Sequence, residues 1–142
     1  MAKTLADFVR AARERIREVD ADTLEEWLEA GEDLLLVDVR EPQEYAAGHI
    51  PGAVNIPRGV LEGAADPNYK HRHPELCQAR DRRVVVYCQT GGRSAMAAAT
   101  LQEMGFGEVW NLAGGIECWE GEDYPLERGE ATKSSGSLTS IS

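Results

Sequence analysis

Residues 83–94 read RVVVYCQTGGRS, a buried-strand pattern followed by a glycine-bearing loop. The run after Ser94, up to Met104, favours a helix that ends at Gly105. Cys88 therefore lies where loop N–H groups and a helix N-terminus favour negative charge, so we expect a stabilised and reactive thiolate. A buried structural cysteine is the alternative, but a structural turn does not need Gly91, Gly92 and Arg93 together.

The rest of the chain alternates between predicted strands and predicted helices. Strands are expected over 34–39, 53–56, 83–87 and 109–112, and helices over 4–18, 22–30, 42–47, 58–63, 74–79, 94–104 and 115–120. Strands alternating with helices predict an α/β fold with a parallel sheet and right-handed crossovers. Sites in such sheets lie at the carboxyl ends of the strands, where Asp38 and Cys88 both fall.

Individual helix ends are predicted from capping residues. Asp22 with Glu25 three residues later resembles a capping box, and Gly31 follows as a stop signal. Pro42 and Gly48 frame a short helix. The amphipathic helix over 4–18 has mixed charge, which favours packing on the domain over lying on a membrane surface. Residues 128–142 contain five serines and little apolar surface, which predicts a disordered tail.

Composition limits the possible partners. The 142 residues suit one domain, and 15 basic against 25 acidic residues give a formal charge of −10. That balance argues against nucleic acid and anionic membranes as partners. No stretch has the length and apolarity of a membrane span or a targeting peptide. Three widely spaced cysteines without a CxxC pair suit a reducing cytoplasm, and His71 and His73 lack a third metal ligand.

Several fragments together resemble a known family. They are Asp38-Val39-Arg40, Glu44-Tyr45, Gly48-His49-Ile50-Pro51-Gly52-Ala53, Asn55-Ile56-Pro57, the Cys88 loop, and Gly114-Gly115 with Trp119. Their order and spacing are similar to those of single-domain rhodaneses of the thiosulfate sulfurtransferase family, over residues 19–125. The resemblance implies a mostly parallel five-stranded sheet with helices on both faces. It divides the chain into a packed N-terminal helix (1–18), a rhodanese domain (19–127) and a tail (128–142).

The resemblance also implies a sulfur relay through Cys88. Its thiolate would take the outer sulfur of thiosulfate or a persulfide, and a thiol, a protein or cyanide would accept that sulfur. No cofactor or metal is implied. The substrate would be bound by the loop after the nucleophile, which consists of Gln89, Thr90, Gly91, Gly92, Arg93 and Ser94. Inward N–H groups there would stabilise the anionic persulfide and the leaving group, and glycine permits the tight turn.

Two departures from the family pattern bear on the substrate. Two-domain thiosulfate enzymes of the family have further basic residues at the site, whereas this loop offers Arg93 alone and Glu44 stands where those enzymes are basic. A persulfide on a small thiol or on a partner protein is therefore a reasonable alternative donor. The second rhodanese copy is also absent, so this domain or a dimer mate must complete the site.

Other residues have mainly structural interpretations. Asp38 and Arg40 are expected to form an ion pair that orders a strand end and supports the site, while Arg58 could reach the pocket mouth. Glu44 and Tyr45 suit packing and capping, and His49 suits a turn in which the backbone satisfies its ring. Trp110 and Trp119 are expected in the core or at its rim. Cys77 is expected to be a bystander, and Cys118 is a candidate resolving thiol.

Two other functions stay open. The first is a persulfide carrier or sensor that acts on partner proteins with little turnover of small molecules. The second is a phosphatase or arsenate reductase, because related folds use Cys-x5-Arg loops for tetrahedral oxyanions. Cys88 and Arg93 are spaced as Cys-x4-Arg, one residue shorter, and a smaller loop suits sulfur better than a phosphate group.

Overall fold

The computed structural model describes residues 1–130. The centre of the fold is a five-stranded, all-parallel sheet. The strands are β1 (Arg17–Val19), β2 (Leu34–Asp38), β3 (Val54–Asn55), β4 (Arg83–Tyr87) and β5 (Glu108–Leu112). Their order is β1-β5-β4-β2-β3, so the cysteine loop follows the central strand, β4. The predicted α/β fold class is confirmed.

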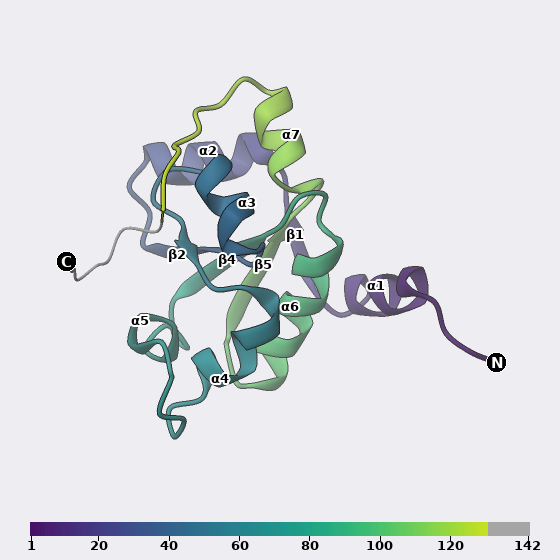
Figure 1. The fold of residues 1–142 in the computed structure, drawn as a ribbon. Helices are drawn as coiled ribbons and strands as arrows, with labels where there is room; N and C mark the ends of the chain where they lie inside the picture. Colours follow the sequence, from purple (N-terminus) through teal and green to yellow (C-terminus); the bar gives the residue numbers. More distant parts are fainter. Residues whose placement is uncertain (131–142) are drawn as a thin grey trace.

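Helices cover both faces of this sheet (Figure 1). They are α1 (Leu5–Arg13), α2 (Ala21–Glu29), α3 (Pro42–Ala47), α4 (Leu61–Ala65), α5 (Pro74–Cys77), α6 (Gly92–Glu103) and α7 (Gly115–Gly121), with a 3₁₀ turn at Arg58–Val60. Because strand side chains alternate, Val84 and Val86 pack toward α4, α5 and α6, whereas Val85 and Tyr87 pack toward α2, α3 and α7. All four side chains are fully buried, which explains the continuous apolar run.

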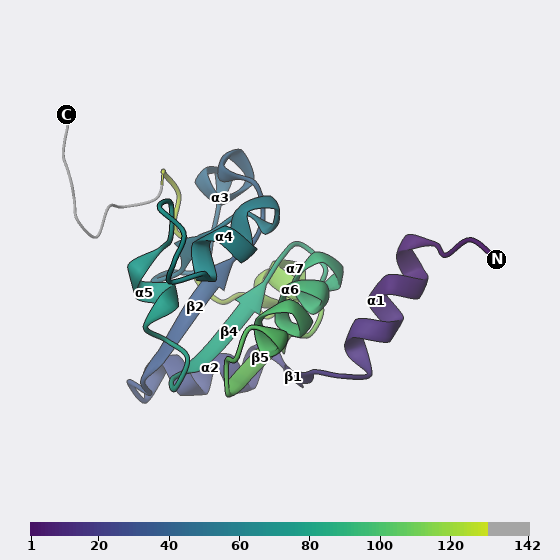
Figure 2. The same cartoon turned by 90° about the horizontal axis from the view of Figure 1, so that it is seen from below.

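The expected helix over 4–18 is wrong at its C-terminal end. Helix α1 is capped by Thr4, whose hydroxyl accepts from the Asp7 N–H, and it ends at Arg13. Residues 17–19 instead form β1, paired with β5. A three-residue edge strand has little local signal, and its pairing with β5 outweighs the helical periodicity. Helix α1 packs against α6 through Ala12, Ala95 and Ala99. Figure 2 shows α1 on the side of the domain where α6 lies.

The predicted N-cap of the next helix is also wrong. Asp20, not Asp22, caps α2, and its carboxylate accepts the Thr23 N–H at 2.8 Å. The helix begins two residues earlier because β1 ends at Val19, so Asp20 is the first residue free to cap. The predicted stop is confirmed, since Gly31 follows the helix with φ of 71°.

The described part of the predicted tail contacts the domain. The Gly129 N–H donates to the Ala46 carbonyl at 2.8 Å, and Glu127 exchanges two backbone hydrogen bonds with His49. The boundary between domain and tail at residues 127 and 128 stays a prediction. Residues 131–142, the remainder of the predicted tail, lie outside the described residues. Within residues 1–130, no helix combines the length and apolarity needed to cross a membrane.

Candidate active site around Cys88

Cys88 follows β4 directly, and its side chain is 1% exposed. Three donors point at its sulfur: the Gly91 N–H at 3.2 Å, the Ser94 N–H at 3.4 Å and the Ser94 hydroxyl at 3.3 Å. All of these interactions favour a charged acceptor, since charge-assisted hydrogen bonds are the stronger kind. The arrangement therefore stabilises an anionic sulfur at this position.

The donors are available because the loop is shorter than expected and is partly helical. Helix α6 begins at Gly92 rather than at Ser94, with Gly91 as its left-handed N-cap at φ of 104°. The first N–H groups of a helix have no partner within the helix, so they can face Cys88. The left-handed conformation at Gly91 explains why glycine stands there.

The N-terminus of α7 holds the opposite side of the loop. The Ile116 and Glu117 N–H groups donate to the carbonyls of Cys88 and Gln89, at 2.9 and 3.2 Å. Gly115 makes this approach possible, because a Cβ atom there would lie 2.6 Å from the Cys88 oxygen. With these carbonyls bound on the α7 side, the loop is held in the orientation that directs the Gly91 and Ser94 N–H groups to the sulfur.

Arg93 is not a free cation. Its Nη1 and Nη2 atoms donate to Oε1 and Oε2 of Glu44 at 3.0 and 3.1 Å. This bidentate pair lowers the pKa of Glu44, chiefly through the hydrogen bonds from Arg93, and raises the pKa of Arg93. Glu44 also accepts the Glu41 N–H at 2.9 Å, so its expected capping role is confirmed. The sequence did not reveal the pairing because the two residues are 49 positions apart.

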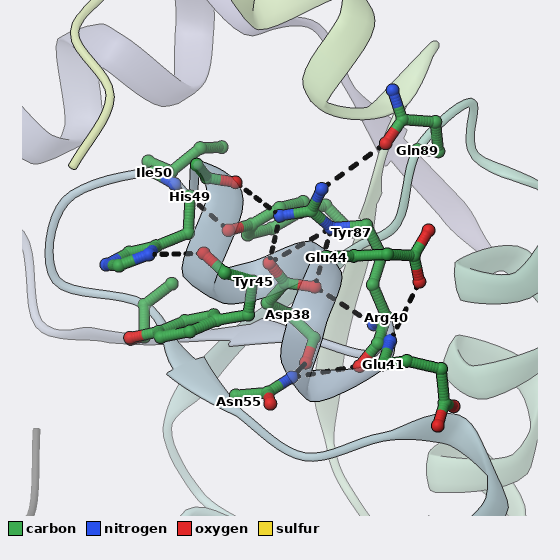
Figure 3. Close-up of polar contacts among 12 residues, drawn as sticks. Asp38, Arg40, Glu41, Glu44, Tyr45, His49, Ile50, Asn55, Tyr87 and Gln89 are labelled. Atoms are coloured by element: carbon green, nitrogen blue, oxygen red, sulfur yellow. Dashed lines mark hydrogen bonds and ion pairs between the residues drawn. The ribbon is translucent and has the colours of Figure 1, made fainter. Parts of the chain in front are cut away.

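Asp38 and Arg40 form a buried ion pair, as expected (Figure 3). Arg40 Nη2 lies 2.7 Å from Asp38 Oδ2 and also donates to the Gly48 carbonyl, while Nη1 donates to Gln89 Oε1 at 3.3 Å. The pair thus connects the end of β2 to the first residue after Cys88. Arg40, Glu44, Gly48 and Gln89 line a hollow of about 280 Å³ on this side of the loop.

Other predicted residues have different partners. Arg58 donates to Glu62 and Thr100 and is not among the residues lining that hollow, so its expected place at the pocket mouth is not supported. His49 lies with Nδ1 2.9 Å from the Tyr45 carbonyl, as expected of a turn histidine. Cys77 donates to the Ala64 carbonyl. Cys118 is exposed and packs against Gly114.

Sequence reasoning missed two residues behind the loop. Asn111, fully buried near the end of β5, donates to the Gly91 carbonyl at 3.2 Å and to Glu18 Oε2 at 2.9 Å. Glu18 comes from β1, which was not predicted. A polar residue inside the predicted strand over 109–112 was the available signal. Asn111 thus connects an edge strand to Gly91, which donates to the sulfur.

These features define a parallel α/β domain in which a cysteine at the end of the central strand accepts from two N–H groups and one hydroxyl. Comparison with known proteins identifies the family that has this fold. Residues 20–122 match the model of the rhodanese-like domain, so the chain belongs to the rhodanese family. A sulfurtransferase of Allochromatium vinosum is 39% identical over 78% of this chain and 94% of its own length. A putative sulfur carrier protein of Bacillus subtilis, YrkF, is 35% identical over 75% of this chain and 52% of its length.

A solved structure from Rhodopseudomonas palustris is also similar. That protein, described as of unknown function and a possible tyrosine phosphatase, superposes with a TM-score of 0.83 at 31% identity. The match covers 89% of this chain and 96% of that one. The same fold is therefore present in a relative that is described as a possible tyrosine phosphatase.

Proposed function

We propose that this chain is a sulfurtransferase that carries sulfane sulfur as a persulfide on Cys88. The single observation that carries the proposal is the set of three donors from Gly91 and Ser94 on the Cys88 sulfur. The names of its rhodanese-family relatives support sulfur transfer in general. A cytoplasmic location, expected from the cysteine usage, would keep this thiol reduced.

In the first half-reaction the Cys88 thiolate attacks the outer sulfur of the donor. A bond forms between Sγ and that sulfur, and the donor's S–S bond breaks. The leaving group, sulfite or a thiolate, departs with the electron pair, and Cys88 retains an anionic persulfide. No general acid is needed, because both leaving groups are stable anions. The Gly91 and Ser94 donors stabilise negative charge beside the reacting sulfur.

The charges around the loop support a persulfide as donor over thiosulfate. Arg93 is paired with Glu44, and Arg40 is paired with Asp38, so two guanidinium groups near the loop are already neutralised. The formal charge of −10 adds an unfavourable field for a dianion. A monoanionic low-molecular-weight persulfide meets less repulsion. We therefore propose that thiosulfate is the weaker of the two donors.

Intact-protein mass spectrometry tests the proposal directly. The protein is incubated with thiosulfate or with cysteine persulfide, a net monoanion, then desalted and weighed, before and after addition of a thiol. We expect one added sulfur atom that is lost after addition of the thiol and that does not form in Cys88→Ser. If the protein takes up no sulfur from either donor, the proposed function is wrong.

A carrier role is the second candidate, supported by the description of YrkF as a putative sulfur carrier protein. A carrier would form the Cys88 persulfide but deliver it to a protein thiol. Steady-state turnover with small thiols separates the two, since an enzyme turns over many times and a carrier stops after one sulfur per chain.

Phosphatase chemistry is the third candidate, and only the description of the R. palustris relative favours it. The Cys-x4-Arg spacing argues against it, and so does the Arg93–Glu44 pair, which leaves that guanidinium already bound by a carboxylate. We expect negligible hydrolysis of an aryl phosphate by protein that takes up sulfur. Efficient hydrolysis without sulfur uptake would favour the phosphatase.

A further inference from the structure

A second and larger groove borders the Cys88 loop on the side of α1. Its volume is about 740 Å³, within the size range of small-molecule sites. Its lining includes Leu5, Val9, Arg13 and Glu14 of α1 with Thr90 and Gly92 of the loop. Helix α1 precedes residues 20–122, which match the family model, so this wall lies outside the rhodanese-like domain itself.

The contacts between α1 and the loop are close. A Cβ atom on Gly91 would lie 3.3 Å from Arg13 Nη2, and one on Gly92 would lie 3.5 Å from Val9 Cγ2. The two glycines therefore turn their bare Cα atoms toward α1. The Gly91 N–H donates to the Cys88 sulfur. Arg13 therefore borders a residue that itself contacts the sulfur.

Arg13 is also held more loosely than the other guanidinium groups at the loop. It lies 3.6 Å from Glu18, and its side chain is 44% exposed. Arg40 and Arg93 have bonds of 2.7 and 3.0 Å to their carboxylates, and Arg10, which also lines the groove, is held by Asp7 at 3.0 Å. Arg13 can therefore bind an incoming anion at a small cost in lost contacts.

We propose that this groove binds the sulfur acceptor, and that the acceptor is a low-molecular-weight thiol of amino-acid type. This inference rests on the proposed function and names the substrate class of its second half-reaction. The acceptor's carboxylate pairs with Arg13, its carbon chain lies on Leu5 and Val9, and its ammonium group faces Glu14. A cation, an anion and an apolar surface in one groove match a zwitterion with a carbon body, which neither cyanide nor a neutral thiol provides.

The step served by this groove is the discharge of Cys88. The acceptor thiol gives up its proton to solvent, and its thiolate attacks the outer sulfur of the persulfide. The S–S bond to Cys88 breaks, Sγ leaves as the thiolate, and the acceptor departs as a persulfide. The donors from Gly91 and Ser94 stabilise this leaving thiolate. Arg13 takes no part in bond changes and acts through acceptor binding.

The test loads Cys88 with sulfur and measures its discharge to glutathione, cysteamine and 2-mercaptoethanol, in the unaltered protein and in Arg13→Ala. Glutathione has carboxylates and an amine, cysteamine has the amine alone, and 2-mercaptoethanol has neither. Differences in thiol reactivity cancel, because each variant is compared with the unaltered protein on the same thiol. We expect the KM for glutathione to rise about tenfold, and the other two KM values to stay within about twofold. Arg13→Lys should recover part of the glutathione effect.

The matched controls are Arg15→Ala and Arg128→Ala. Arg15 pairs with Glu103 next to α1, and Arg128 lines the hollow on the other side of the loop. Neither should change the KM for glutathione. Binding of S-methylglutathione, which cannot react, should weaken in parallel in Arg13→Ala when followed by calorimetry.

The outcomes separate this inference from the proposed function. If Cys88 takes up no sulfur, the proposed function fails. If Cys88 loads and discharges but Arg13→Ala changes all three thiols equally, or leaves glutathione unchanged, the inference is overturned and the sulfurtransferase stands. An effect of Arg128→Ala in place of Arg13→Ala would also overturn it.

Discussion

The Arg93 guanidinium and the Glu44 carboxylate meet through two parallel hydrogen bonds of 3.0 and 3.1 Å, which join the first turn of α6 to α3. This contact places a carboxylate beside the loop that follows Cys88. The carboxylate repels an anionic sulfur donor that approaches the loop. This repulsion differs between donors, because it grows with the charge of the donor. We therefore expect the pair to influence donor selectivity, and it can be changed without altering Cys88.

Neutralising Glu44 should improve the use of thiosulfate. In Glu44→Gln the shape is kept and Arg93 loses its ionic partner, so the KM for thiosulfate should fall by roughly three- to tenfold. The KM for a monoanionic persulfide should change less. Glu62→Gln is the control, since it removes a carboxylate paired with Arg58 instead. Steady-state kinetics with both donors provide the measurement, and a higher KM for thiosulfate in Glu44→Gln would contradict it.

The same pair predicts a pH dependence of stability. The pKa of Glu44 is lowered from its ordinary 4.5, mainly by the Arg93 hydrogen bonds. A carboxyl group with a depressed pKa in the folded state contributes stability above its unfolded pKa and loses it as pH falls through the folded value. The difference in urea midpoint between the unaltered protein and Glu44→Gln should thus be present at pH 7 and shrink below about pH 4. A difference that grows on acidification would show the opposite linkage.

Removing the Cys88 thiol should abolish persulfide formation. Cys88→Ser keeps the fold, because a hydroxyl can accept from the same N–H donors, but it lacks the nucleophile. Cys77→Ser and Cys118→Ser should retain most activity, since neither thiol accepts from the loop donors. Sulfur uptake by mass and turnover are both measured. Full activity of Cys88→Ser would contradict the mechanism.

Ser94 tests the hydroxyl donor separately from the backbone donors. Ser94→Ala removes the Oγ interaction with Cys88 and leaves the N–H in place. Loss of one donor to a developing anion costs on the order of a hundredfold, so sulfur transfer should slow by roughly tenfold to a hundredfold. Thr100→Ser, further along α6, is the control. A rate equal to that of the unaltered protein would mean that the backbone donors suffice.

Gly115 tests the support of the loop by α7. A Cβ atom at φ of 66° would press on the carbonyls of Gln89 and Cys88, so Gly115→Ala should lose about 1–3 kcal/mol of unfolding free energy and most activity. Gly121→Ala, at the other end of α7, meets no atom within 4 Å and serves as the control. Chemical unfolding and persulfide formation are measured on both variants. Equal unfolding free energies of Gly115→Ala and Gly121→Ala would show that the loop can shift away from the added Cβ atom.

The amino-acid sequence by itself determined the fold class and the central strand, and it singled out Cys88, the residue that we propose as the nucleophile. The apolar run at 84–87 is buried on both faces and therefore has no alternation to misread, and the glycines after Cys88 mark where the backbone must turn. Gly31 likewise marked the end of α2, because a left-handed residue is a local requirement. Such features depend on neighbours along the chain.

The tertiary structure alone decided which charges are free at the site. Arg93 is 49 residues from Glu44 and Glu18 is 93 residues from Asn111, and no local pattern encodes such pairs. The short strand β1 exists because β5 supplies its hydrogen bonds, and its formation ends α1 early and moves the cap of α2 to Asp20. The groove beside α1 likewise requires that helix to pack on α6. Charge pairing, edge-strand formation and grooves depend on distances in space, which the order of residues does not specify.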